Sequence, residues 1–504
     1  PVEGISDDFI RGMDASAVLS IEKSGAKYYG YDGKEQDVFK TLAESGINYI
    51  RLRVWNDPYD ADGNGYGGGN NDVATAVELG KRATEYGMKV SIDFHYSDFW
   101  ADPKRQHAPK AWQGMTADEK ADALYTFTRD SLKEILDAGV DVGMVQVGNE
   151  INNGMSDETD VPSVMKLLTA GSKAVRESAA DYNKDILVAL HYTNITDNEQ
   201  VDTMAANLKK YNVDYDVFGL SYYPFWDGTN ENMQNVAKNI MDKYGKQVMI
   251  SETSYAYTTE DGDGFANSFD GVEGAVDGYA ATVQSQATMI RDICADANEV
   301  GVIGVFYWEG TWIPVGSRDA DNSGLWEKYG SGWASSYSAD YDPDDAGLYY
   351  GGSSWDNQAM FDFTGHPLAS LNVFKYVGTG ASAALAVDSI DSAELTVNLG
   401  EPVELPEKVT VHFNDNTTGD RTVNWNQQQL DALVEAGSGT YTVDGTVEVL
   451  GQEYKVSCKV VIKAKNYVNN YSFEESDRSM WKVEDEGKCT DYQNNASDAL
   501  TGNY

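Results

Sequence analysis

Cysteine is scarce in this sequence: three cysteines, Cys294, Cys458 and Cys489, occur among 504 residues. Three are too few for a disulfide framework, and their spacing matches neither a zinc site nor a CxxC motif. Cys294 lies in an apolar helical pattern and is interpreted as a small buried hydrophobic residue. Cys458 and Cys489 are able to form one disulfide, but nothing in the sequence requires it.

Long apolar runs are also missing. No stretch reaches the roughly 18 apolar residues of a membrane-spanning helix, so we expect no membrane insertion. No signal peptide is visible, and the chain begins at Pro1. A mature, processed N-terminus has this form, and so does an excised fragment.

Positive charge is scarce as well. The chain has 38 Lys and Arg residues against 81 Asp and Glu residues, a formal net charge of −43 spread along the sequence. Such a surface repels phosphate groups and anionic lipid headgroups, so we expect no nucleic-acid partner and no binding to a membrane surface. The apolar fraction of 41% is enough for a folded core, which argues against a disordered acidic chain.

Aromatic residues, in contrast, are abundant: 11 Trp, 32 Tyr and 15 Phe. Packing in the core and at its rim explains most of them. The functional alternative is a set of flat platforms for a neutral ligand with apolar faces, such as a sugar, because aromatic rings bury large areas while keeping a polar edge hydrated.

The first 380 residues alternate short β-rich runs with amphipathic helical patterns. The expected strands are near-continuous apolar runs, as in parallel strands covered on both faces: 9–13, 47–55, 88–95, 143–147, 186–191, 217–222, 247–252 and 302–308. Helical patterns lie between them, for example at 74–86, 117–138, 162–180 and 230–244. Eight such units predict an α/β fold, a (β/α)₈ TIM barrel, over residues 1–380.

The composition changes after Gly378. Residues 381–465 show alternating β patterns with turn residues at short spacing, at 395–399, 409–413, 423–425, 439–443, 447–449 and 454–462. This pattern predicts a small β-sandwich. Residues 466–504 read as the start of a further β module, which is too short to bury a core of its own.

Polar and aromatic residues follow six of the expected barrel strands. Catalytic residues of a (β/α)₈ barrel lie at the C-terminal ends of its strands, so these segments are expected to share one face. They read RLRVWN at 51–56, DFHYSD at 93–98, GNE at 148–150, SYYP at 221–224, SET at 251–253 and YWE at 307–309.

Two of these residues, Glu150 and Glu252, suit glycosidic bond cleavage. One carboxyl must be protonated to donate to the leaving oxygen, and the other must be ionised to attack the anomeric carbon. We expect Arg53 to keep Glu252 ionised, Tyr222 to donate a hydrogen bond to Glu252, and Asn149 to hold a sugar hydroxyl. The alternative role for the two glutamates is a structural ion pair, and Glu309 and Asp93 are rival carboxylates.

The motifs around these residues resemble glycoside hydrolase family 53, the arabinogalactan endo-β-1,4-galactanases. The resemblance covers about residues 1–377 and rests on the segments RVWNDP at 53–58, GGGNND at 67–72, DFHYSDFWADP at 93–103, VQVGNE at 145–150, LSYYPFW at 220–226, ISETSYAYT at 250–258, WEKYGSGWASS at 326–336 and DNQAMFDF at 356–363.

The resemblance implies a retaining endo-hydrolase of β-1,4-galactan, the neutral side chain of pectin, with Glu150 as acid/base and Glu252 as nucleophile. It also implies an extracellular bacterial enzyme, secreted or attached to the cell surface, which we expect to be a monomer. The expected partners are the polysaccharide and galacto-oligosaccharides. Residues expected at the reacting sugar are Arg53, His95, Asn149, Tyr222 and Trp308. Further candidates for sugar contact, with packing as the alternative, are Trp55, Asp98, Trp100, Trp326 and Trp333.

Two histidines have open roles. His95 is interpreted as part of the hydrogen-bond network of the acid/base rather than as a proton donor. His191, after the fifth strand, is either substrate-facing or structural.

A calcium site is the next expectation. The segment from Asp261 begins like an EF-hand but lacks the required Gly, which is Ala266, and the closing Glu, which is Val272. Bacterial members of the resembled family hold Ca²⁺ between the loops after strands 7 and 8, and the matching positions are Asp261, Asp263, Phe265 (through its carbonyl), Asn267, Ser353 and Asp356. The ion would bridge two loops without taking part in the chemistry, and a metal-free acidic loop is the alternative.

The C-terminal region resembles bacterial Ig-like modules, which act as spacers, in its segments VNW at 423–425, AGSGTY at 436–441 and VDGTV at 443–447. Residues 466–504 resemble the opening of a truncated carbohydrate-binding module. Two other functions remain open: a related barrel enzyme that cleaves mannan, xylan or β-1,4-glucan, and a non-catalytic sugar-binding protein.

Overall fold

The structure, a computed structural model, describes residues 1–380, 386–414, 418–449 and 452–464. It divides into two compact units, Pro1–Ala381 and Ser382–Tyr504. The truncated module expected at 466–504 and Cys489 lie outside the described residues, so the structure does not test whether Cys458 pairs with Cys489. Among the described residues, no helix is long and apolar enough to cross a membrane.

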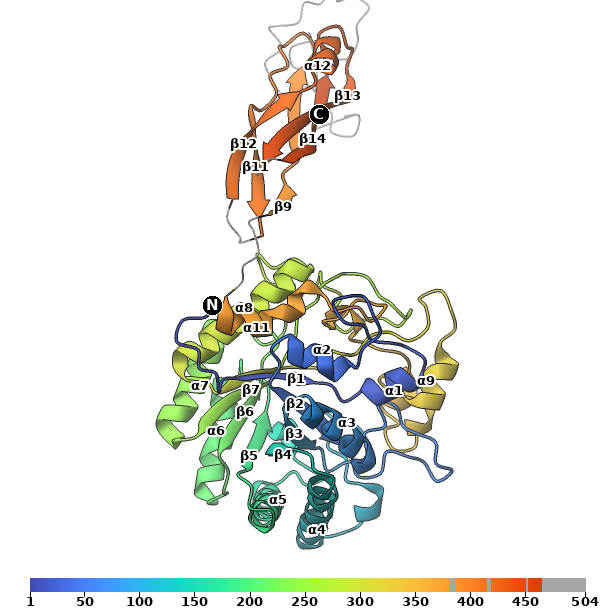
Figure 1. The fold of residues 1–504 in the computed structure, drawn as a ribbon, viewed down its shortest axis with the longest axis vertical. Coiled ribbons are helices and arrows are strands. Elements are labelled where there is room, and N and C mark those ends of the chain that lie inside the picture. The colour runs from blue at the N-terminus through green and yellow to red at the C-terminus, as the bar shows by residue number, and fades with distance from the viewer. Residues whose placement is uncertain (381–385, 415–417, 450–451, 465–504) are drawn as a thin grey trace, which may run out of the picture. The chain divides into compact units, whose positions relative to one another are not determined.

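The first unit is a closed barrel of eight parallel strands, as the sequence predicts (Figure 1). Each strand pairs with the next, and β8 pairs with β1 to close the barrel. The strands are β1 (Ile10–Asp14), β2 (Tyr49–Val54), β3 (Lys89–Phe94), β4 (Val142–Val147), β5 (Leu187–Tyr192), β6 (Val217–Ser221), β7 (Gln247–Thr253) and β8 (Gly304–Tyr307).

Helices surround the barrel, and polar residues begin most of them. Before each helix from α3 to α8, an Asp or Thr side chain accepts a hydrogen bond from a backbone N–H of the first turn, which satisfies a donor that the helix leaves unpaired. The helices of this unit are α1 (Val18–Lys23), α2 (Val38–Glu44), α3 (Val73–Glu85), α4 (Ala117–Asp137), α5 (Val161–Asp181), α6 (Asn198–Lys210), α7 (Asn230–Tyr244), α8 (Val283–Val300), α9 (Ser323–Tyr329), α10 (Ala346–Tyr349) and α11 (Val373–Thr379). Cys294 is fully buried in α8, as predicted.

The interior of the barrel has an apolar floor. Seven strands contribute one buried residue each to this layer: Ile10, Tyr49, Met144, Ala189, Val217, Met249 and Phe306. Side chains of a strand alternate between its two faces, so the next inward positions follow two residues later. At those positions β2, β4 and β5 carry Arg51, Gln146 and His191, which are buried and polar. The polar network of the site therefore rests directly on this floor.

The described residues of the second unit form six strands in the order β10-β14-β13-β12-β11-β9. The first part of β12 pairs with β11 and its last three residues pair with β13, and two separate apolar clusters form the core. The elements are β9 (Val387–Ile390), β10 (Ala393–Asn398), β11 (Lys408–Phe413), β12 (Thr418–Trp425), α12 (Gln427–Leu433), β13 (Gly439–Val449) and β14 (Gln452–Lys463).

Two features of this unit differ from the sequence prediction. Helix α12 was not expected, and β13 is one continuous strand where two strands were expected, at 439–443 and 447–449. Gly445 lies within the β13 pairing, opposite Trp425. A Cβ atom at Gly445 would come within 2.6 Å of the Trp425 ring, so this glycine permits close packing and does not make a turn.

Candidate active site

A cleft of about 370 Å³ opens at the C-terminal ends of the barrel strands. The residues that line it come from loops after several strands, and seven of them were expected at the reacting sugar or near it from the sequence. These seven are Arg53, His95, Trp100, Asn149, Glu150, Trp308 and Trp333, and they surround Glu252. The structure therefore brings both candidate catalytic carboxyls into one aromatic cleft.

Glu150 lies two residues beyond the Gly148 that follows β4, and its backbone is left-handed, with φ of 48°. This conformation is rare for a residue with a long side chain and marks a position that the surrounding structure determines. Ser221 Oγ donates a hydrogen bond to Oε1 of Glu150 at 2.7 Å. The side chain is thus oriented from β6, two strands away around the barrel.

Glu252 reaches the cleft because β7 is irregular. Met249 points into the barrel floor, so regular alternation would direct Ser251 inward and Glu252 outward. The pairing of β6 with β7 shifts register here: Leu220 lies opposite Ile250, and the next residue, Ser221, lies opposite Glu252. Such an extra residue redirects the side chains that follow it, and Glu252 lines the cleft.

Two buried groups hold the Glu252 carboxyl. Arg51 Nη1 donates to Oε1 at 2.9 Å, and the Tyr223 hydroxyl donates to Oε2 at 2.8 Å. A carboxylate oxygen of Glu252 lies within 4.8 Å of one of Glu150. The two candidate catalytic carboxyls therefore face each other at close range.

Neither residue expected to bond Glu252 does so. The donors are residues close by in the sequence, Arg51 and Tyr223. The prediction that Arg53 holds Glu252 is wrong, since Arg53 bonds Glu309 and the carbonyl of Gly68. Arg51 and Arg53 share the inward face of β2. Arg51 lies one inward position closer to the floor residue Tyr49, and it is the arginine that donates to Glu252.

The prediction that Tyr222 donates to Glu252 is also wrong. Ser221 points inward, so the next inward residue is Tyr223. Tyr222 faces away from the cleft and donates to Asn230 at 2.7 Å.

The surroundings of the two carboxyls shift their pKa values by different amounts. Burial raises the pKa of Glu150 well above its ordinary value, and the negative charge of Glu252 raises it further. Burial also raises the pKa of Glu252, but the Arg51 charge and the hydrogen bond from Tyr223 lower it. Glu150 is therefore the carboxyl that keeps its proton, and Glu252 is the one that ionises first.

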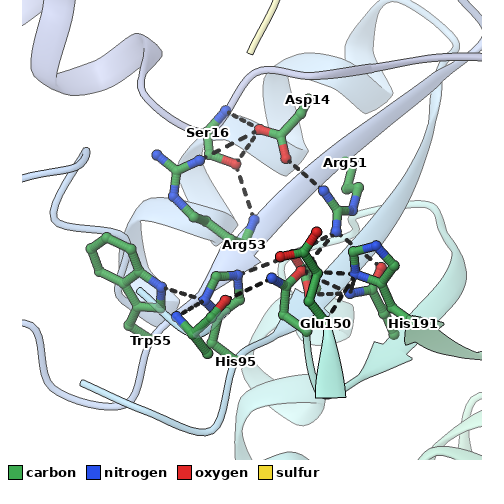
Figure 2. A network of polar contacts seen from close by, with 12 residues as sticks. Asp14, Ser16, Arg51, Arg53, Trp55, His95, Glu150 and His191 are labelled. Atoms are coloured by element: carbon green, nitrogen blue, oxygen red, sulfur yellow. Dashed lines mark hydrogen bonds and ion pairs between the residues drawn. The ribbon is translucent and has the colours of Figure 1, made fainter. Parts of the chain in front are cut away.

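A buried network connects the carboxyls to the strands below (Figure 2). Asn149 Oδ1 accepts from Arg51 at 3.0 Å and from Gln146 at 3.1 Å, and Asn149 Nδ2 donates to the carbonyl of Ala101 at 2.8 Å. His191 accepts the Glu150 N–H at Nδ1. The proton of His191 is therefore on Nε2, from which it donates to Ser221 at 2.8 Å. Burial, with the nearby Arg51 charge, lowers the pKa of His191 well below its ordinary value, so His191 is a neutral, orienting residue.

His95 also has an orienting role. Its Nδ1 accepts from Trp55 Nε1 and from the backbone N–H of Ala101, both at 3.0 Å, so its Nε2 donates to Asp93 at 3.2 Å. Asp93 in turn accepts from Gln146 at 2.7 Å. His95 therefore belongs to the network beneath the carboxyls, as expected.

The rival carboxyls are both paired with buried arginines. Asp93 is buried and lies 3.0 Å from Arg51, and Glu309 is fully buried against Arg53. Glu309 does not line the cleft. Both residues neutralise the buried arginines.

Three of the weaker candidates for sugar contact do not line the cleft. Trp55 has no exposed surface and packs in a separate aromatic cluster. Asp98 accepts hydrogen bonds from the backbone N–H groups of Asp57 and Lys110. Trp326 packs against Phe265. These side chains shape the loops around the cleft.

Ser221, which holds Glu150, was not identified from the sequence, and neither were five residues that line the cleft: Tyr223, Trp226, Asp227, Trp312 and Trp355. Tyr223 and Trp226 lie in the LSYYPFW segment at 220–226. Alternation of side chains along the strand was the signal that could have identified Tyr223 as pointing inward. Trp355 comes from a distant loop, where the sequence carried no signal for the cleft.

A second carboxylate cluster lies in the loops after β7 and β8. One oxygen from each of Asp261, Asp263 and Asp356 lies within 4.8 Å of the others. Burial, together with the neighbouring negative charges, raises the pKa of Asp263 to about 7 and that of Asp356 to about 8. Asn267 donates to Asp356 at 2.9 Å, while its buried Oδ1 has no partner in the part of the chain that the structure describes.

This oxygen-rich, negatively charged donor set fits a hard cation. The other expected ligands lie beside the cluster: the backbone N–H groups of Phe265 and Ser353 each donate to Asp263, at 2.9 and 2.7 Å.

Family models match both units of the chain. The model of Glycosyl hydrolase family 53 matches residues 10–374, and that of the bacterial Ig-like domain (group 4) matches residues 390–450. Endo-beta-1,4-galactanase of Bacillus subtilis is 54% identical over 384 residues, which cover 75% of this chain and 88% of that protein. Arabinogalactan endo-beta-1,4-galactanase of Cellvibrio japonicus is 32% identical over 72% of this chain and 89% of that protein.

Solved structures are similar as well. The Ignisphaera aggregans GH53 catalytic domain superposes with a TM-score of 0.65 at 38% identity and covers 75% of this chain and 98% of that chain. A fungal beta-1,4-galactanase superposes with a TM-score of 0.58 at 27% identity, over 73% of this chain and 98% of that chain.

Proposed function

This chain belongs to glycosyl hydrolase family 53, and from that premise we propose that it is a retaining endo-β-1,4-galactanase. The observation that carries the proposal is the placement of Glu150 and Glu252, which lie within 4.8 Å of each other in an aromatic cleft. Carboxyl groups of retaining glycosidases lie about 5–5.5 Å apart, whereas inverting enzymes need about 6.5–9.5 Å to admit a water molecule. The short separation supports double displacement.

In the first step, Glu252 attacks the anomeric carbon while Glu150 donates its proton to the glycosidic oxygen. The bond to the leaving sugar breaks, and a covalent galactosyl–enzyme ester forms on Glu252. In the second step, ionised Glu150 takes a proton from water, which attacks the same carbon and releases the sugar with its original configuration.

The surrounding groups support these roles. Arg51 and Tyr223 favour the ionised form of Glu252, which the first step needs. Burial and the charge of Glu252 favour the protonated form of Glu150. Once the ester forms, the charge on Glu252 is gone, so the pKa of Glu150 falls and Glu150 becomes a base for the second step.

The cleft supports a neutral polymer as the substrate. Indole side chains of Trp100, Trp308 and Trp333 offer apolar faces, and Asn149, Arg53 and His95 add polar groups beside the carboxyls. We assign to these residues the contacts with β-1,4-galactan, the neutral side chain of pectin. The enzyme would act outside the cell, secreted or attached to the surface, as a monomer.

The acidic cluster supports a structural calcium ion. Asp261, Asp263 and Asp356 would ligate it with Asn267 Oδ1, and Phe265 and Ser353 complete the expected set. The ion would neutralise three carboxylates and join the loops after β7 and β8 without entering the chemistry.

The test is hydrolysis of purified potato-type β-1,4-galactan, with sizing of the products. We expect internal cleavage, and we expect Glu150→Ala and Glu252→Ala to abolish it. Glu134→Ala, an exposed site on α4, is the matched control. Near-wild-type turnover by either active-site variant would overturn the catalytic assignment. Preferred cleavage of mannan, xylan or β-1,4-glucan in parallel assays would overturn the substrate.

A further inference from the structure

The loop after β6 carries two cleft residues that the mechanism above does not use. Trp226 and Asp227 both line the cleft, and Trp226 is 54% exposed, whereas the other tryptophans of this unit are buried or half-buried. A half-exposed indole beside a carboxylate in a cleft combines an apolar face with a hydrogen-bond acceptor. Sugar-binding sites need both kinds of group.

A tight turn fixes the position of Asp227. Its Oδ2 accepts the backbone N–H of Tyr223 at 2.7 Å, and its own N–H donates to the Tyr223 carbonyl at 2.7 Å. Tyr223 is the residue whose hydroxyl holds Glu252, so Asp227 is positioned by the catalytic machinery itself.

The second oxygen of Asp227 is available to a ligand. Within the described part of the chain, Oδ1 accepts no hydrogen bond, and no Lys, Arg or His side chain forms an ion pair with Asp227. A partly buried carboxylate without a cation gains from any hydroxyl group that donates to it. Burial raises the pKa of Asp227 to about 6, as expected for such a carboxylate.

The side of the cleft follows from the strand that precedes this loop. The last residue of β6, Ser221, donates to Glu150 at 2.7 Å, and Asp227 follows six residues later. After burial and the charge of Glu252, Asp227 is among the negative charges that raise the pKa of Glu150, so it lies toward the acid/base. The acid/base protonates the leaving oxygen, so the leaving sugar occupies this side.

We propose that Trp226 and Asp227 form a galactosyl-binding subsite on the leaving-group side of Glu150. Asp227 Oδ1 accepts hydrogen bonds from hydroxyl groups of the leaving sugar, and the Trp226 indole covers an apolar face of the same ring. The inference rests on the proposed galactanase function and adds the residues that select the leaving group.

The test measures kcat/KM of the Asp227→Asn variant on two substrates. An asparagine still accepts the Tyr223 N–H, so the turn is kept, but it presents N–H groups to the cleft in place of an acceptor. One substrate is β-1,4-galactohexaose, which fills both sides of the cleft. The other is dinitrophenyl β-1,4-galactobioside, whose leaving group has no sugar hydroxyls and needs no proton from Glu150. Glu231→Gln, an exposed carboxyl of α7 close in sequence, is the matched control.

We expect kcat/KM of Asp227→Asn to fall about 10- to 100-fold on the hexaose, the size of one lost hydrogen bond to a charged group, and to change less than about twofold on the aryl substrate. Trp226→Ala should show the same contrast, and Glu231→Gln should match the wild type. Equal losses of kcat/KM on both substrates would mean that the loop only supports Glu252. No loss on either substrate would mean that Trp226 and Asp227 form no subsite. Either result would overturn the inference. A wild-type enzyme inactive on the hexaose would overturn the proposed function instead.

Discussion

Arg51 donates a hydrogen bond to Glu252 at 2.9 Å, and both side chains are buried. The same guanidinium lies 3.0 Å from Asp93 and 3.3 Å from Asp14 and donates to Asn149 at 3.0 Å. One cation thus balances three buried carboxylates and connects the candidate nucleophile to the residue before the candidate acid. The pH dependence of the enzyme should follow from this arrangement.

Replacing Arg51 should shift the acidic limb of the pH profile. Arg51 lowers the pKa of Glu252, so Arg51→Met raises that pKa, and the nucleophile ionises only at higher pH. We expect the acidic limb of kcat/KM to move to higher pH and the maximum to fall about 100-fold, comparable to the loss of one preorganised donor.

Arg51→Met also leaves buried carboxylates unpaired, so folding must be verified by circular dichroism. Arg51→Lys keeps the charge and should keep the acidic limb nearer its wild-type position. An acidic limb that stays in place in folded Arg51→Met would contradict the role of Arg51.

The two adjacent tyrosines should respond differently to loss of the hydroxyl. Tyr223→Phe removes the donor to Glu252 and should lower kcat/KM about 10-fold. Tyr222→Phe removes a hydrogen bond to Asn230 on the other side of the strand and should cost about 1 kcal/mol of unfolding free energy with activity retained. Kinetics and thermal melting of both variants make the comparison, and the reverse order of effects would contradict the structure.

Loss of the Ser221 hydroxyl should extend activity to higher pH. Its hydrogen bond favours ionised Glu150 and lowers that pKa, so Ser221→Ala raises it. The acid must be protonated in the first step, and the basic limb of kcat/KM should therefore move to higher pH. The measurement is a full pH–rate profile with Glu134→Ala alongside. A basic limb that moves to lower pH would show that Ser221 stabilises the protonated acid instead.

Removal of calcium should destabilise the barrel unit. A bound ion stabilises by about 2.7 kcal/mol when free Ca²⁺ exceeds its Kd a hundredfold, so EDTA should lower the melting temperature by a few degrees. Asp356→Asn should melt low with or without EDTA, because it removes a ligand of the proposed ion. Asp344→Asn, an exposed carboxyl of the same loop, should keep the wild-type response. A wild-type melting temperature unchanged by EDTA would argue against the ion.

Much of the barrel could be predicted from the sequence because its strands are apolar on both faces and its helices have clear starts. Glu150 and Glu252 were found by the rule that catalytic residues follow barrel strands. That rule locates the end of a strand without giving the direction of a side chain. It succeeded for Glu252 although the shift in β7 register reverses the simple alternation there.

The residues that hold the carboxyls were harder to predict. Arg51 and Arg53 lie on the same face of one strand and differ only in depth, which depends on the stagger of neighbouring strands. Side chains alternate along a strand, so only one of Tyr222 and Tyr223 points inward. The sequence alone does not show which of the two it is. Trp355 and Asp227 belong to loops whose paths depend on tertiary contacts.

In the C-terminal unit, two strands were expected at 439–443 and 447–449, but β13 is continuous through Gly445, which lets it pass the Trp425 ring. The sequence does not distinguish a glycine that makes a turn from one that permits close packing. The neighbouring strand shows which role the glycine has.

The central claim is that Glu150 and Glu252 act by double displacement on β-1,4-galactan. The most direct measurement follows the anomeric signals of newly formed reducing ends by proton NMR during the first minutes of hydrolysis, before mutarotation. The account predicts that the β-anomer forms first and that the α-anomer grows in later. Initial release of the α-anomer would indicate a single inverting displacement and would contradict the account.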